Sequence, residues 1–224
     1  MLEHWMPSCR SRFTQADFDF VASSLTPHES SCHLAKLWKD SEGQRELLDL
    51  KEIFRSLLDC PSALQVSPRF YFYVLVRHAF LQASLTDEEL ADYVAGVLAK
   101  RVCTDAEDAL QGVTRGFTHV ADFLAVISPA KGRMRFHLQV AAGNQFLVLT
   151  GLYPDFLKSR WERGESPNID FYESFAQKAF QSAASSRHAA SGPSRHLLGS
   201  LAEIIPTARL SLNRIAEEFV FLGE

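Results

Sequence analysis

The chain has 224 residues and a formal net charge of −4, and 46% of its residues are hydrophobic. This composition allows a sizeable core and excludes a disordered chain, while the acidic balance argues against a nucleic-acid surface, which needs clustered Lys and Arg. The four cysteines form no C-x-x-C pair, which argues against a disulfide scaffold or a structural zinc site and favours a reducing, cytoplasmic compartment.

The first half of the chain shows several helix starts, in which an N-cap residue precedes a proline or a box of acidic residues. These starts lie at Thr26, Ser67, Thr86 and Thr104. We expect residues 1–13 to be irregular. Apolar spacing predicts one amphipathic helix over 41–58, whose buried stripe contains Leu47, Leu50, Phe54 and Leu57. A buried helix over 67–83 and a helix over 86–101 follow.

In the second half, helices are predicted over 132–150 and 154–161 and from an Asp170 N-cap to about 187. Residues 163–168 have the composition of a loop. Residues 186–194 contain Gly, Pro and several Ser, which predicts a flexible loop before the last helix.

The last helix carries apolar residues at alternating spacings of four and three, a heptad-like seam. Pro206 lies inside the seam and is expected to kink the helix, yet the apolar phase continues across it. We therefore predict one long kinked helix or two nearly coaxial ones. Such a seam occurs both in homodimers and in bundle helices that pack on their own domain. The candidate interface residues are Leu201, Ile205, Leu212, Ile215, Phe219 and Leu222.

Together these elements predict an all-α protein. We expect a single-domain multi-helix bundle over residues 1–224, with a long, Pro-kinked C-terminal helix.

Polar residues inside apolar helices are the best candidates for a ligand site. Arg77 and His78 interrupt the apolar run after Val76, and His137 and Asn144 share one helix face seven residues apart. Buried polar groups need partners. Either a structural network or a small molecule bound between helices would supply them.

A metal site is a weaker alternative. On a helix His28 faces Cys32 and Glu29 faces His33, each pair one turn apart. However, Glu29 is also the expected acid of a capping box, and no further ligands follow at a recognisable spacing. We therefore predict no cofactor.

Catalytic motifs are missing from the sequence. It has neither a G-x-S-x-G elbow nor a Gly-rich phosphate loop, so no catalytic residue is predicted. Lys131, Arg133 and Arg135 form a short basic group, which is either an anion or partner patch or a solvated helix end. Mixed charge around them favours the solvated end.

Several short motifs resemble a group of uncharacterised bacterial all-helical proteins that carry a Gly–aromatic–acidic turn followed by an Asp-Tyr-Tyr-like helix start. The motifs are 150–155, 170–172, 179–180, Ser67-Pro68, 76–78 and 90–95. This sequence departs from the group at Phe171 and Phe180, where Tyr is more common. The resemblance spans roughly residues 65 to 222 and implies a shared helical fold and a bacterial source. No activity is known for the group, so it implies no function.

The sequence leads to two functional hypotheses. The first is a non-enzymatic protein-interaction or regulatory protein that binds another protein or forms a homodimer through the last helix. The alternative is a helical-bundle enzyme or sensor with a buried small-molecule or metal site. Neither hypothesis involves a nucleic acid, because the net charge is negative. Neither involves a membrane, because the most apolar stretch, 146–153, is far shorter than the roughly 20 residues of a membrane-spanning helix.

Overall fold

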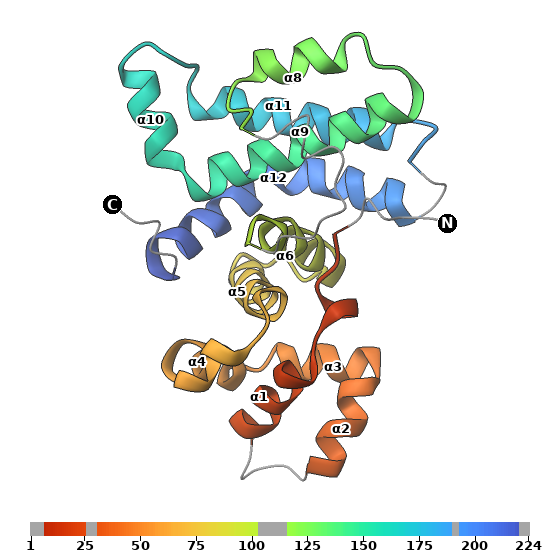
Figure 1. Cartoon of the computed structure of the whole chain (residues 1–224), viewed down its shortest axis with the longest axis vertical. Coiled ribbons are helices and arrows are strands. Elements are labelled where there is room, and N and C mark those ends of the chain that lie inside the picture. The colour runs from red at the N-terminus through yellow and green to blue at the C-terminus, as the bar shows by residue number, and fades with distance from the viewer. Residues whose placement is uncertain (1–6, 26–30, 103–115, 190–192, 220–224) are drawn as a thin grey trace. The chain divides into compact units, whose positions relative to one another are not determined.

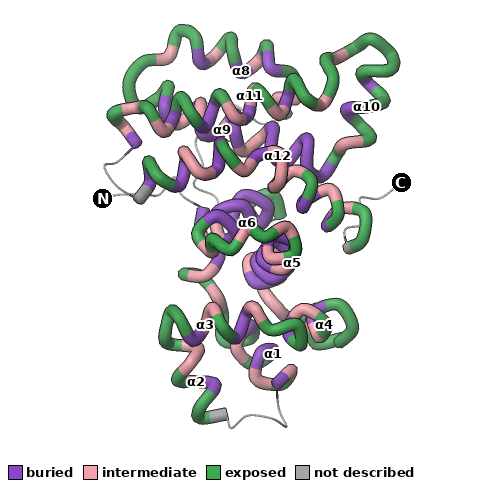
Figure 2. The backbone as a smooth tube through the Cα atoms, turned by 180° about the vertical axis from the view of Figure 1, so that it is seen from behind, coloured by how far each residue is buried: buried purple, intermediate pink, exposed green. Residues whose placement is uncertain are grey.

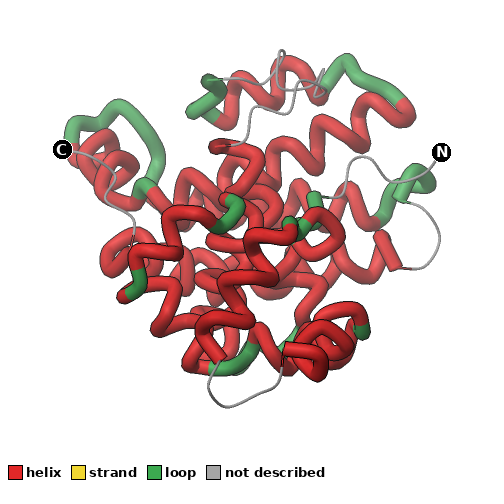
Figure 3. Tube along the Cα trace, turned by 60° about the horizontal axis from the view of Figure 1, so that its bottom comes forward, coloured by secondary structure: helices red, strands yellow, loops and turns green. Residues whose placement is uncertain are grey.

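The computed structural model describes residues 7–25, 31–102, 116–189 and 193–219. In these ranges the chain forms helices, turns and loops and no strand, as Figures 1 and 3 show. The predicted all-α class is confirmed. The contacts divide the chain into two compact units, residues 1–104 (unit 1) and 105–224 (unit 2). A single domain over the whole chain stays a prediction.

Unit 1 is organised around helices α5 and α6, which pack against each other and are buried along most of their length (Figure 2). The segment before α1 is bound to α6, because a carboxylate oxygen of Asp92 accepts the backbone N–H groups of Cys9 and Arg10, each at 2.9 Å. The elements are η1 (Arg10–Arg12), α1 (Gln15–Leu25), α2 (Ser31–Lys39), α3 (Ser41–Leu48), α4 (Lys51–Asp59), η2 (Pro61–Gln65), α5 (Pro68–Gln82) and α6 (Glu88–Val102).

Two of the predicted helix starts of unit 1, at Ser67 and Thr86, lie within the described residues. The Ser67 hydroxyl accepts the Phe70 N–H at 3.1 Å, as predicted. At α6 the capping side chain is Asp87 rather than Thr86, because its carboxylate accepts the N–H of Glu89 at 2.9 Å. The predicted starts at Thr26 and Thr104 lie outside the described residues.

The prediction of one helix over 41–58 is wrong. Helix α3 ends at Leu48, and α4 begins at Lys51 after Leu50, whose backbone is extended (φ −67°, ψ 132°). At the break, Asp49 forms an ion pair with Arg77 of α5. A single helix would continue through Asp49, which instead pairs with Arg77. The apolar stripe predicted over 41–58 is therefore shared between α3 and α4.

Unit 2 has a core of three mutually packed helices, α9, α11 and α12. The loop before α11 ends at Asn168, whose side chain accepts the Phe171 N–H at 3.1 Å, so the cap lies two residues before the predicted Asp170. After α11, residues 185–189 form a turn, in agreement with the predicted loop. The helices are α8 (Val120–Ile127), α9 (Gly132–Leu152), α10 (Pro154–Glu162), α11 (Ile169–Ala184) and α12 (Pro193–Phe219).

Helix α12 runs without interruption from Pro193 to Phe219 and contains Pro206, so the single long helix is confirmed. Its apolar phase is kept on both sides of Pro206, because Leu201 and Ile205 before it and Leu212 after it are each 0% exposed.

Close helix packing in unit 2 depends on two glycines of α9. A Cβ at Gly143 would lie 2.7 Å from ring atoms of Phe180 in α11, and a Cβ at Gly151 would lie 2.7 Å from the Leu212 side chain in α12. Such approaches leave no room for even one methyl group. Beside the second contact, the Asn213 side chain donates to the carbonyls of Thr150 and Gly151 at 2.9 and 2.7 Å, which satisfies acceptors at the end of α9.

Gly143→Ala is expected to lower the free energy of unfolding by about 1 to 3 kcal/mol, because the added Cβ would lie 2.7 Å from the fully buried Phe180 ring and would force it to shift. Gly199→Ala in α12 is the matched control, since nothing lies within 4 Å of its added Cβ. There, helix propensity is expected to raise stability by up to about 1 kcal/mol. Urea unfolding followed by far-UV circular dichroism measures both, and equal effects of the two variants would contradict the packing argument.

Candidate functional site

The four polar residues predicted to line a pocket are divided between the two units. Arg77 and His78 lie on α5 of unit 1, and His137 and Asn144 lie on α9 of unit 2. Arg77 is buried, and its Nε and Nη2 donate to the two carboxylate oxygens of Asp49 at 2.7 and 2.8 Å. Its Nη1 donates to the Thr86 carbonyl at 2.7 Å. The hydrogen bonds with Asp49 raise the pKa of Arg77, and this guanidinium is committed to structural partners.

His78 and His137 also have neighbours within their own units. The His78 ring stacks on Phe54, with ring centroids 3.6 Å apart, and lies 2.9 Å from the Gln82 amide. His137 accepts from Arg133 Nε at 3.1 Å. Asn144 is half-buried on α9. These contacts favour the structural-network alternative.

The predicted metal ligands are only partly within the described residues. Cys32 and His33 are exposed at the start of α2, whereas His28 and Glu29 lie outside the described part of the chain. In the described ranges, no group of three or more His, Cys, Asp or Glu side chains is placed to hold a metal ion.

Four of the six residues of the predicted interface are interior. Leu201, Ile205, Leu212 and Ile215 are at most 1% exposed, and α12 packs against α9 and α11 of the same unit. A dimer through them would require α12 to leave these helices, so the structure favours the bundle interpretation of the seam. Of the remaining two, Phe219 is the last residue of α12 and Leu222 lies beyond the described residues.

Two buried hydroxyls have no hydrogen-bond partner among the described groups, those of Tyr73 in unit 1 and Tyr172 in unit 2. Burial raises the pKa of Tyr73 far above its ordinary value, so the phenol stays protonated. The two residues are 0% and 1% exposed, which places both in packed interior.

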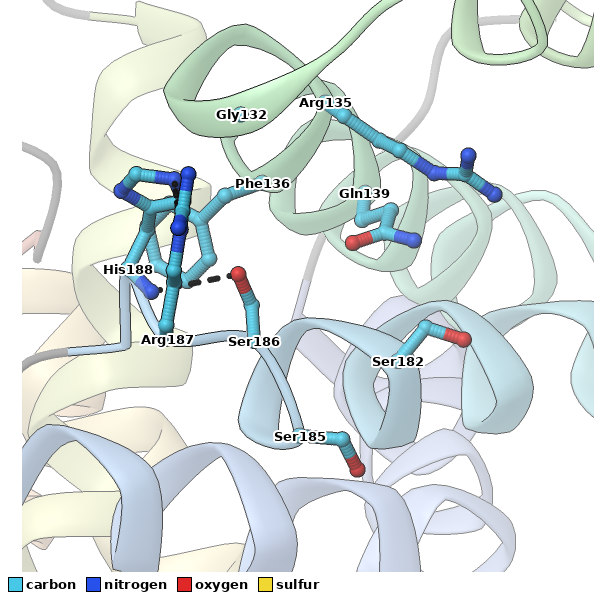
Figure 4. Close-up of a pocket in the computed structure, with 9 residues that line it drawn as sticks. All are labelled: Gly132, Arg135, Phe136, Gln139, Ser182, Ser185, Ser186, Arg187 and His188. Atoms are coloured by element: carbon cyan, nitrogen blue, oxygen red, sulfur yellow. Dashed lines mark hydrogen bonds between the residues drawn. The ribbon is translucent and has the colours of Figure 1, made fainter.

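A pocket of about 300 Å³ lies in unit 2 where the first turns of α9 meet the end of α11 and the turn after it (Figure 4). The buried ring of Phe136 forms part of its wall. The volume is at the lower end of the range of small-molecule sites, roughly 300 to 1,000 Å³. The lining residues are Gly132, Arg135, Phe136, Gln139, Ser182, Ser185, Ser186, Arg187 and His188.

The side chains of this pocket make it basic, because its lining includes Arg135, Arg187 and His188 but no acidic residue. Arg135 is exposed and has no side-chain partner among the described residues. Arg187 Nε donates to His188 Nε2 at 3.4 Å, and the backbone N–H of His188 donates to the Ser186 hydroxyl at 3.2 Å. The pocket therefore offers cations, hydroxyls and one amide to a ligand.

The start of α9 strengthens this positive character. The N-cap Lys131 makes no side-chain capping bond, and the first turn contains no acidic residue. The N-terminal end of a helix carries a partial positive charge, so basic residues there are unfavourable unless an anion is close. This charge arrangement favours a negatively charged ligand.

From the sequence, the basic group containing Arg135 is expected to be a solvated helix end, and residues 186–194 are expected to be a loop. The pocket forms because these two distant segments meet. The one feature of the local sequence that pointed to this pocket was the group of basic residues at the start of α9 without acidic residues beside them.

In the ranges that the structure describes, every helix is too short or too polar to cross a membrane. Comparison with models of known protein families, with curated proteins and with solved structures found no match. The resemblance to a bacterial helical group therefore stays a prediction, and the chemistry of the pocket is the basis for a functional proposal.

Proposed function

We propose that this chain is a non-enzymatic binding protein whose ligand is a small anion held in the pocket between α9 and α11. The observation that carries the proposal is the pocket lining, in which two arginines and a histidine occur with hydroxyl and amide groups and without an acid. Guanidinium groups donate in a planar fork that matches oxyanions.

The contacts inside the pocket support binding rather than nucleophilic catalysis. An activated serine needs a base within hydrogen-bond reach of its hydroxyl. Here the described contact of the Ser186 hydroxyl is with the backbone N–H of His188, and the His188 ring accepts from Arg187. The imidazole is thus directed at a cation rather than at a serine. This arrangement supports the binding hypothesis over the enzyme alternative.

Titration of the ¹⁵N-labelled protein with acetate and with inorganic phosphate, at constant ionic strength, tests the proposal. We expect saturable shifts in the backbone amide signals of Gly132, Ser186 and His188, since these residues line the pocket. Arg187→Gln is expected to raise the dissociation constant of the anion by about tenfold, because it removes a charge-assisted hydrogen bond. Shifts that fail to saturate, or that spread evenly over the surface, would refute an anion site.

A further inference from the structure

We propose that the pocket selects a small dianion with two separated carboxylates, a short dicarboxylate. This inference rests on the proposed function, since it specifies the ligand class of the same pocket. It follows from where the two guanidinium groups lie relative to the neutral part of the lining.

Figure 4 shows the two arginines of the lining on opposite sides of the view. Arg135 projects from α9 on one side, and Arg187 lies beside His188 on the other. In this view the uncharged Gln139 amide and Ser186 hydroxyl lie between them. The pocket is thus positive at both ends and neutral in the middle.

This distribution of charge decides between classes of anion. A carboxylate has two oxygens and is satisfied by a single guanidinium fork, so a monocarboxylate would leave one arginine uncompensated. A phosphate group concentrates its charge at one point, which matches one end of the pocket. A dicarboxylate places one carboxylate at each end and an uncharged chain between them, beside the Gln139 amide and the Ser186 hydroxyl.

The volume agrees with a ligand of this size. About 300 Å³ accommodates a short chain with two carboxylates but is at the lower limit for small-molecule sites. Middle groups such as Gln139 and Ser186 would hydrogen-bond a hydroxyl, keto or amide substituent on the chain.

Calorimetric titration at low ionic strength tests the inference with succinate, glutarate and adipate, with pentanoate as the singly charged counterpart of glutarate, and with methyl phosphate. The best of the dicarboxylates is expected to bind at least about tenfold more tightly than pentanoate. The reason is that a second charge-assisted contact contributes about that factor or more.

Three variants separate the pocket from general surface charge. Arg135→Gln and Arg187→Gln should each reduce dicarboxylate binding to the level of pentanoate. Arg133→Gln is the matched control, because Arg133 is exposed on the same turn of α9 but contacts His137 and does not line the pocket. It should change the affinity by less than about threefold, the effect of a screened surface charge. Circular dichroism checks that the exposed substitutions leave the fold intact.

The outcomes distinguish the two proposals. If no anion binds, both the proposed function and this inference fail. If pentanoate binds as tightly as every dicarboxylate, or methyl phosphate binds most tightly, the anion site stands and the dicarboxylate inference is overturned. Equal losses in the Arg133 and Arg135 variants would also overturn it, since binding would then reflect general charge.

Discussion

Phe146→Ala is expected to lower the free energy of unfolding by about 4 kcal/mol, the largest effect of any substitution considered. Phe146 is 0% exposed on α9. Its ring centroid lies 5.4 Å from that of Phe123 on α8, and 5.4 and 5.3 Å from those of Tyr172 and Phe175 on α11. Alanine would leave a cavity where three helices meet, and it would remove ring contacts that each contribute about 0.5 to 1.5 kcal/mol beyond buried area.

Urea unfolding followed by circular dichroism measures this loss, and amide hydrogen exchange of α9 locates it. Phe171→Ala is the matched control, because the same side chain is 46% exposed at the start of α11. Its removal should cost less than about 1 kcal/mol. A similar loss in both variants would show that Phe146 is not the centre of the unit 2 core.

Asp49→Ala is expected to destabilise the protein by about 2 to 3 kcal/mol, because it leaves the buried Arg77 guanidinium without its carboxylate. The side chain of Arg77 is 4% exposed and that of Asp49 is 29% exposed. Solvent therefore reaches part of the pair, which places the effect at the lower end of the range for buried ion pairs. The same change is expected to loosen the link from the α3–α4 junction to α5.

A double variant makes this prediction specific. Asp49→Ala combined with Arg77→Met removes both charges, so the unpaired buried cation no longer exists and part of the lost stability should return. Asp59→Ala, an exposed carboxylate at the end of α4, should change stability by less than about 0.5 kcal/mol. If the double variant is no more stable than Asp49→Ala alone, the cost does not come from the stranded charge.

Local patterns in the sequence predicted much of the helical structure. Ser67 was identified as an N-cap because capping involves only the next three residues, and the structure has that hydrogen bond. The phase of the seam predicted one long helix across Pro206 or two nearly coaxial ones, and the structure has the single helix. One missing backbone bond costs less than leaving the apolar face unburied. Errors at Asp170 and Thr86 were shifts of one or two residues, where a neighbouring Asn or Asp provides the cap instead.

The candidate ligand residues show what local sequence patterns do not determine. Arg77 and His137 were chosen because a polar group within an apolar helix needs a partner. The structure supplies Asp49 to the first and Arg133 to the second. Periodicity reports which face a residue occupies but not what lies opposite, so it could not separate an ion pair from a ligand site.

The sequence by itself determined the helical class, the Ser67 cap and the seam of α12, because these depend on residues within one or two turns of each other. Only the tertiary structure decided that 41–58 is two helices, that the seam is interior, and that Arg135 and Arg187 share a basic pocket. Each of these depends on residues far apart in the chain, whose ion pairing and close packing override local helix propensity.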